Sequence, residues 1–197
     1  MENNNNKQKI LNAAIILFQD KGYYGTGLNE ILRKSDCPKG SLYYYFPNGK
    51  EQLALESIEM TKNFVDGMIR RNLEKIDDPA ESMKKFVREM AENVYIDNDD
   101  LSSFQSNRKI SINLIALETS KTNDNIRKAC EEAYSTFEKA YFDKLVENGF
   151  DDDKAKEVSK TIESLIEGAI LMSTVKKDDT YILNVADIIY DLIKKSS

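Results

Sequence analysis

The sequence predicts an all-α fold. Its 197 residues include only three prolines, and apolar side chains recur at intervals of three and four residues along most of the chain, which is the spacing of a helix. No stretch alternates between apolar and polar residues in the way that indicates a half-buried strand. A chain of this length is able to bury the cores of one or two small domains.

The first fifty residues predict three short helices. An apolar stripe indicates a helix over about 7–21, and Gly22 suits its C-cap. Thr26 suits the N-cap of the second helix. Pro38 interrupts that helix and suits the first turn of a third, which ends at the turn-forming residues 46–49. Two short helices joined by a tight turn are typical of a helix-turn-helix that reads DNA.

The third helix has one face suited to the major groove. Lys39 and Tyr43 lie four residues apart, and Gly40 beside them leaves the backbone open to a close approach. The alternative, more common for any single tyrosine, is that these are ordinary core and surface aromatics, but the motif as a whole favours DNA. The candidate DNA-contact residues are Thr26, Ser35, Lys39, Gly40, Ser41, Tyr43, Tyr44, Tyr45 and Lys50.

Residues 7–56 resemble the DNA-binding domain of the tetracycline-repressor (TetR) family. The resemblance covers the segments KQKILNAAIILFQDKGYYGTGLNEIL and PKGSLYYYFPNGKEQLALES, and it is closest to the branch around the lincomycin-resistance regulator. It implies a DNA-binding helix-turn-helix domain over 1–48 and a larger helical domain over 49–197 for ligand binding and dimerisation. It also implies a transcriptional repressor that a small hydrophobic effector releases from its operator.

Charge is divided unevenly along the chain. The formal net charge of −6 by itself argues against a nucleic-acid partner. Residues 1–50, however, contain seven Lys and Arg against four Asp and Glu, a balance of +3, whereas residues 51–197 contain 21 against 30, a balance of −9. This asymmetry orients the mildly basic first part toward DNA, and we expect a dimer to double its contacts.

The composition argues against an enzyme. The sequence has no histidine, which removes Ser-His-Asp and Cys-His catalysis and the usual zinc sites, and it has no phosphate-binding glycine loop. Its two cysteines lack metal-like spacing and are expected to be free thiols. No cofactor is expected. No signal peptide or membrane-spanning run is recognised, so we expect a cytoplasmic protein without a membrane partner.

The chain beyond residue 48 predicts six more helices. The first, over about 49–76, leads from the DNA-binding part into the second domain. The others are expected over about 79–96, 109–119 and 125–148, from Asp152 or Asp153 to about 175, and from Asp179 or Thr180 to about 194.

Methionines and aromatic residues in the middle helices suit an adaptable apolar pocket that contains a few polar groups, such as tyrosine hydroxyls. The family resemblance implies such a pocket beside the long helix, where Glu118 is a candidate partner for a cationic ligand. For each residue alone, structural core is the more common role, and for Glu118 a place at the surface or at a helix end. The candidate effector-binding residues are Phe64, Met68, Phe86, Met90, Phe104, Leu114, Leu117, Glu118, Tyr134, Phe137 and Tyr141.

The last two predicted helices each carry a wide apolar stripe. One interpretation is internal core, whereas the family resemblance favours a four-helix bundle made by two helices from each of two subunits. The candidate dimer-interface residues are Val158, Ile162, Leu165, Ala169, Met172, Ile182, Val185, Ile189 and Leu192.

Together these observations favour a ligand-responsive, DNA-binding transcriptional regulator. Its expected partners are double-stranded operator DNA, a small hydrophobic effector and a second copy of the chain. The alternative is a helical scaffold or adaptor without DNA binding, for which the face formed by Lys39 and Tyr43 would be incidental.

Overall fold

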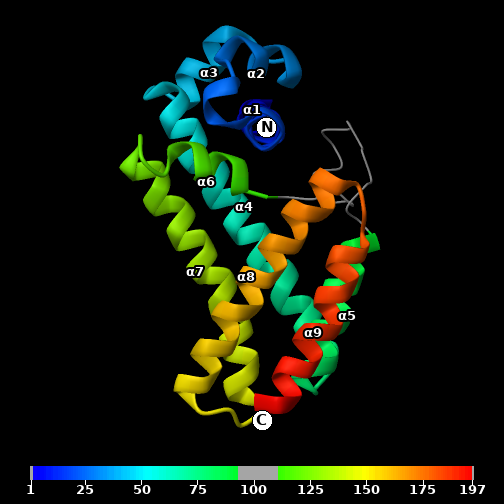
Figure 1. Ribbon diagram of the computed structural model, residues 1–197. Helices are drawn as coiled ribbons and strands as arrows, with labels where there is room; N and C mark the ends of the chain where they lie inside the picture. Colours follow the sequence, from blue (N-terminus) through cyan, green and yellow to red (C-terminus); the bar gives the residue numbers. More distant parts are fainter. Residues whose placement is uncertain (1, 93–110, 197) are drawn as a thin grey trace. The chain divides into compact units, whose positions relative to one another are not determined.

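The computed structural model describes residues 2–92 and 111–196, and within these ranges it contains nine helices and no strand (Figure 1). The all-α fold class is therefore confirmed. The end of the helix expected to reach residue 96 and the candidate effector residue Phe104 lie outside the described residues.

The chain forms two compact units. Unit 1 comprises Met1–Asn63 and Asp97–Ala133, and unit 2 comprises Phe64–Ile96 and Tyr134–Ser197. Two long helices, α4 (Gly49–Leu73) and α7 (Asp124–Glu147), contribute residues to both units. This grouping reflects compactness alone, so the functional division expected between residues 48 and 49 stays a prediction.

Unit 1 contains the three predicted N-terminal helices. These are α1 (Glu2–Gly25), α2 (Leu28–Ser35) and α3 (Lys39–Tyr45). α1 begins earlier than expected, and Gly22 interrupts its regular geometry with φ 73° and ψ 179°. The left-handed region of φ is readily adopted only by glycine, which explains why the regular helix stops at this residue.

The cap of α2 differs from the expected one. Gly27, and not Thr26, is the N-cap. Thr26 is buried, and its hydroxyl donates to the carbonyl oxygens of Leu17 at 3.0 Å and Gly22 at 2.7 Å. The Thr26 side chain therefore closes the end of α1 instead of capping α2. At the other end of α2, Asp36 adopts a left-handed φ of 52° and turns the chain toward α3.

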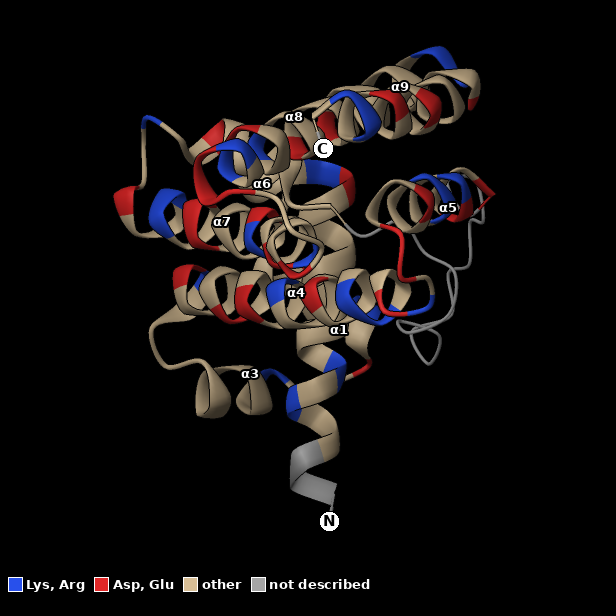
Figure 2. Cartoon of the chain, turned by 90° about the horizontal axis from the view of Figure 1, so that it is seen from below, with Lys and Arg blue, Asp and Glu red and all other residues tan. Residues whose placement is uncertain are grey.

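The rest of unit 1 includes the start of α4, the short helix α6 (Asn113–Thr119) and the first part of α7. The α6 helix packs against α1. Lys62 of α4 is largely buried and pairs with Glu132 of α7 at 2.6 Å. Acidic and basic residues are interspersed along α4 and α7 (Figure 2).

Unit 2 contains α5 (Pro79–Glu92), α8 (Asp152–Lys176) and α9 (Thr180–Ser196), together with the remaining parts of α4 and α7. α9 packs against both α5 and α8 (Figure 1). The N-cap of α8 is Asp151, whose side chain accepts a hydrogen bond from the Lys154 N–H at 3.0 Å. The helix itself begins at Asp152, one of the two expected starts.

Both cysteines of the chain are buried. Cys37 and Cys130 are free thiols in this structure. Across residues 2–92 and 111–196, no helix is long and apolar enough to cross a membrane.

Candidate DNA-binding interface and effector site

The α3 helix has one buried side and one side exposed to solvent. Leu42 and Phe46 are fully buried, which confirms that they face inward together. On the other side Tyr43 is 49% exposed and Tyr44 is 71% exposed, and Lys39 is also exposed. A helix anchored by two apolar residues in this way presents its outer face at a fixed orientation.

The residues of the predicted DNA-reading face lie together on α3. Lys39 is the only charged residue of this helix, and its Nζ lies 5.9 Å from the centroid of the Tyr43 ring. Gly40 is exposed, and a Cβ added there would meet no atom of the protein within 4 Å. Packing therefore does not require glycine at this position. An open backbone beside a cation and a phenol is suited to close contact with base edges.

Two candidate DNA-contact residues are corrected, because their side chains are buried. The hydroxyl of Thr26 is engaged with the end of α1, as described above. Ser35 is buried as well, and its hydroxyl donates to the Leu32 carbonyl at 3.1 Å. Both residues shape the helix-turn-helix from inside and offer no hydroxyl to a DNA phosphate.

Three other candidates are partly exposed. Ser41 and Tyr45 are half-buried, and the Tyr45 ring packs edge-on against Tyr44 with centroids 4.9 Å apart. The Nζ of Lys50 lies 4.5 Å from the centroid of the Tyr23 ring, and burial lowers the pKa of Lys50. A lysine held over a ring is pre-positioned at the start of α4, which suits a phosphate contact.

The end of α6 is joined to the end of α1. Glu118 Oε2 accepts a hydrogen bond from the Tyr24 N–H at 3.2 Å, and its carboxylate lies against Gly22, where an added Cβ would clash with the carboxylate atoms. The Tyr24 hydroxyl donates to Thr122 Oγ1 at 2.6 Å. Glu118 is thus corrected from an effector residue to a contact that joins the end of α1 to α6.

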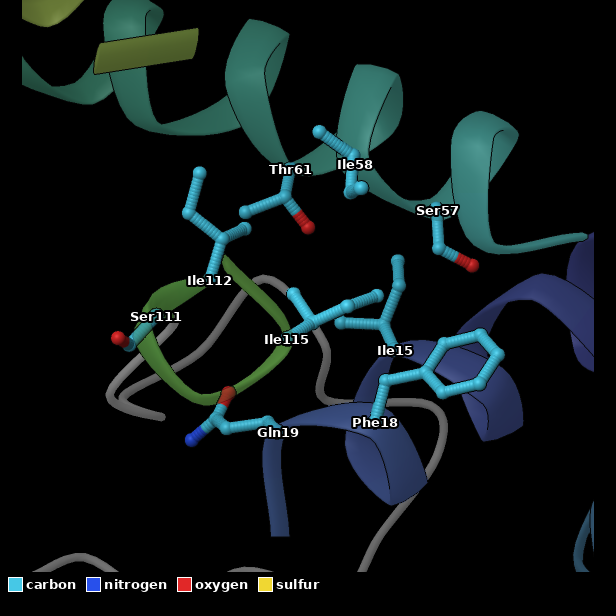
Figure 3. Close-up of a pocket in the computed structure, with 9 residues that line it drawn as sticks. All are labelled: Ile15, Phe18, Gln19, Ser57, Ile58, Thr61, Ser111, Ile112 and Ile115. Atoms are coloured by element: carbon cyan, nitrogen blue, oxygen red, sulfur yellow. The ribbon is translucent and has the colours of Figure 1, made fainter. Parts of the chain in front are cut away.

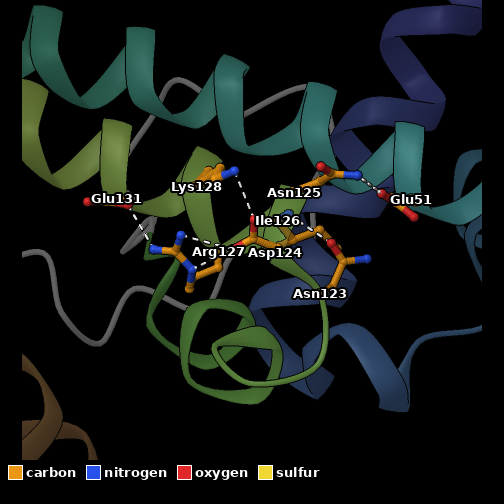
Figure 4. Close-up of polar contacts among 8 residues, drawn as sticks. All are labelled: Glu51, Asn123, Asp124, Asn125, Ile126, Arg127, Lys128 and Glu131. Atoms are coloured by element: carbon orange, nitrogen blue, oxygen red, sulfur yellow. Dashed lines mark hydrogen bonds and ion pairs between the residues drawn. The ribbon is translucent and has the colours of Figure 1, made fainter.

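The start of α7 is also joined to the start of α4 (Figure 4). The Asn125 side chain donates to Glu51 Oε1 at 2.8 Å. Asn123 caps α7 by accepting from the Ile126 N–H at 2.9 Å. The first turns of α7 are further stabilised by ion pairs of Asp124 with Arg127 and Lys128, at 2.9 and 2.8 Å.

A small apolar cavity lies among α1, α4 and α6 in unit 1 (Figure 3). Ile15 and Phe18 of α1, Ile58 of α4 and Ile115 of α6 line it together with polar atoms such as the hydroxyl of Ser57. Its volume is about 10 Å³, which is room for about one water molecule. A site for a drug-sized effector needs several hundred Å³, so this cavity is not that site.

The structure divides the candidate effector residues between the two units. Leu114 and Leu117 lie in unit 1 with exposed side chains, Leu117 at 69%, so these two assignments are corrected. Seven candidates gather in unit 2. Of these, the buried ones are Phe86, Phe137 and Tyr141, and the half-buried ones are Phe64, Met68, Met90 and Tyr134.

Sequence reasoning missed an acid in unit 2. Glu163 of α8 is only 6% exposed, and its Oε1 has no hydrogen-bond partner among the residues that the structure describes. Burial, followed by the charges of Glu167 and Glu138, raises the pKa of Glu163 to about 9. Tyr141 lies close enough that Glu163 and Glu167 add to the effect of burial in raising its pKa.

The predicted dimer interface is partly wrong. Five of its residues are buried inside unit 2 of a single chain, where they belong to the core: Val158, Ile162, Ala169, Ile182 and Ile189. Leu165, Val185 and Leu192 are half-buried and Met172 is exposed, so these four stay candidates. The exposed apolar residues of α8 and α9 beyond those nine candidates are Leu171, Val175, Leu183 and Ile188.

Family models match both parts of the chain. The model described as bacterial regulatory proteins, tetR family, matches residues 10–56. The model described as transcriptional regulator LmrA/YxaF-like, C-terminal domain, matches residues 79–188.

Whole-chain comparisons agree with these matches. The HTH-type transcriptional regulator LmrA of Bacillus subtilis is 40% identical over 195 residues, covering 99% of this chain and 100% of that protein. The uncharacterized HTH-type transcriptional regulator YxaF of the same organism is 37% identical, covering 96% of this chain and 95% of its own. The crystal structure of a TetR-family regulator from Cytophaga hutchinsonii has the same fold, with a TM-score of 0.80 at 22% identity, covering 100% of this chain and 97% of that one.

Proposed function

The chain belongs to the TetR family of bacterial transcriptional regulators, and on this premise we propose that it is a repressor released from its operator by a small effector. The observation that supports DNA reading is the exposed face of Lys39, Gly40 and Tyr43 on a helix whose other side is fully buried. Lys39 is assigned to a base edge, and Lys50 to a phosphate.

We propose that the working form is a homodimer. The α8 helix exposes Leu171, Met172 and Val175, and α9 exposes Ile188 between the half-buried Val185 and Leu192. An apolar face of this kind on a monomer is typical of a protein interface. A two-fold dimer places two recognition helices on successive major grooves about 34–36 Å apart.

The link between effector and DNA is assigned to α4. This helix is continuous from Gly49, immediately after the α3 turn, to Leu73 in unit 2. An effector that shifts the second half of α4 therefore shifts a helix whose first residues follow the DNA-binding helices directly. A changed spacing between the two recognition helices loses contacts at both half-sites at once.

The alternative, a helical adaptor without DNA binding, makes a different prediction for one experiment. A gel-shift assay with the DNA upstream of the chain's own gene should show a retarded complex that specific competitor removes and unrelated DNA does not. An adaptor would show no difference between the two competitors.

The family consists of transcriptional regulators. We therefore assign this chain no catalytic role, and we place it in the cytoplasm with its DNA.

The effector step has its own test. An effector that releases operator must bind the DNA-free form more tightly, with a coupling of about 1–3 kcal/mol, and operator must weaken effector binding by the same factor. A ligand that binds tightly and leaves operator affinity unchanged would show that its site is not the switch.

A further inference from the structure

We propose that the effector site in unit 2 takes an organic cation, with Glu163 as its counter-charge and the aromatic side chains of α7 as its wall. This inference rests on the proposed function, because it names the ligand class of the same regulator. The earlier candidate for this role, Glu118, is engaged with the end of α1 in unit 1.

The first support is the burial of a carboxyl group without a partner. Glu163 lies on the inward face of α8 between the buried Ile162 and Ile166, and its Oε1 accepts no hydrogen bond from any described residue. Removing a carboxyl from water without compensation is costly, and folded proteins rarely keep such a group without a use. A ligand that pairs with the Glu163 carboxyl would explain why the protein keeps this buried acid.

The second support is the sign of the surrounding charge. The charged groups that act on Glu163 are Glu167, one turn later on α8, and Glu138 on α7, and Glu163 in turn acts on the acidic hydroxyl of Tyr141 on α7. All of them are acids, so ionising any one disfavours ionisation of the others. A bound cation relieves this repulsion, whereas an anion increases it.

The third support is the aromatic wall. Tyr134, Phe137 and Tyr141 follow one another at intervals of three and four residues on α7, and so share one face of that helix. The rings of Tyr134 and Phe137 meet edge-on with centroids 6.2 Å apart. Aromatic faces attract organic cations when water is excluded, and a carboxylate beside them supplies the opposite charge.

The proton balance gives the proposal a signature. At neutral pH the Glu163 carboxyl holds its proton, because its pKa is raised to about 9. A permanently charged ligand favours the carboxylate, so binding transfers this proton to solvent. Affinity for such a cation should therefore increase by about tenfold per pH unit over pH 6–8, as expected when one proton leaves on binding.

Calorimetric titration of the full chain with two probes of equal size and opposite charge tests this. Tetraphenylphosphonium is the cation and tetraphenylborate the anion; tetramethylammonium and benzyltrimethylammonium extend the cations to smaller sizes. We expect at least one cation to bind, with proton release visible as a dependence of the heat on the buffer. Tetraphenylborate should bind at least tenfold more weakly than tetraphenylphosphonium.

The variant Glu163→Gln preserves the shape of the side chain and removes the carboxylate. It should weaken cation binding at pH 8 at least tenfold and abolish its pH dependence. Glu147→Gln, which changes an exposed acid at the end of α7, should leave both unchanged. Proton release by the parent chain is measured independently of how well the variant folds.

Three results would overturn the inference: no binding by any of the three cations at millimolar concentration, equal binding of the cation and the anion, or full cation affinity in Glu163→Gln. Operator binding measured on the same preparations keeps the two proposals apart. Intact operator binding with any of these three results refutes the cation site alone, whereas a parent chain that binds no operator refutes the proposed function.

Discussion

Glu118 and Tyr24 join the end of α6 to the end of α1, through a hydrogen bond of 3.2 Å from the Tyr24 N–H to the Glu118 carboxylate. The Tyr24 side chain extends the connection by donating to Thr122 in the turn before α7. These contacts join α1, the first of the three N-terminal helices, to α6 and to the turn before α7 within unit 1. A sequence match to a helix-turn-helix does not reveal them.

Replacing Glu118 with alanine should destabilise the protein moderately. The change removes a charge-assisted hydrogen bond at a half-exposed site, which is worth about 1 kcal/mol, and should lower Tm by about 2–4 °C. Glu147→Ala removes an exposed acid and should leave Tm unchanged. Equal Tm values for the two variants in thermal unfolding would show that the contact with Tyr24 contributes nothing.

Gly40→Ala should separate DNA binding from folding. A Cβ at this position meets no protein atom, and alanine is favoured over glycine within a helix by about 1 kcal/mol, so Tm should stay the same or increase. The same Cβ would stand between α3 and a closely approaching base edge. Anisotropy titration should therefore show weaker operator binding by a protein that is at least as stable. Unchanged affinity would place Gly40 outside the interface.

Ile188→Lys should break the dimer. Ile188 is 54% exposed on the apolar face of α9, and a charge placed in a subunit interface is not compensated there. Sedimentation should give twice the chain mass for the parent at micromolar concentration and a single chain mass for the variant. Leu117→Lys makes a comparable change at an exposed site of unit 1 and should stay dimeric. A parent that sediments as a stable monomer would remove this interface.

Glu163 should make the protein less stable as the pH rises. Its pKa is raised in the folded chain from an ordinary 4.5 to about 9, mainly by burial, so between these values the folded state holds a proton that the unfolded state has lost. The stability that this extra proton contributes is fully present below the unfolded-state pKa of 4.5 and is lost as the pH rises through the folded-state pKa of about 9. Between these two values the free energy of unfolding falls by up to about 1.4 kcal/mol per pH unit. Urea unfolding at pH 6 and 8 should show this decrease in the parent and in Glu147→Gln, and a smaller decrease in Glu163→Gln. The same decrease in all three would contradict the assignment.

The helices could be predicted from sequence because their signals are local. Apolar spacing, together with Gly22, Pro38 and Gly149, was enough to place most elements within a few residues. The exact caps could not be predicted, because neighbouring residues satisfy the same pattern. Thr26 and Gly27 both suit an N-cap, and the burial of the Thr26 hydroxyl against α1 decides between them.

The site residues were harder to predict because periodicity does not say what a face contacts. The apolar face of α8 is wide enough to contact two other helices. Val158 and Ile162 on this helix are buried in the core of their own unit, whereas Leu171 and Val175 are exposed. Glu163 had one usable signal. It precedes Ile166 and Ile170 by three and seven residues, so it lies within the apolar face of its helix.

Operator binding by Lys39→Ala is the most direct test of the DNA-reading assignment. Lys39 carries the only charge of α3 and lies beside Tyr43 on its exposed face. We expect the variant to lose about 1–3 kcal/mol of binding free energy and to lose its preference at one base position. Lys50→Ala should instead weaken binding to all sequences similarly and reduce the salt dependence. Lys156→Ala, an equal charge change on an exposed part of α8, should bind like the parent, and a Lys39→Ala protein that does the same would contradict the account.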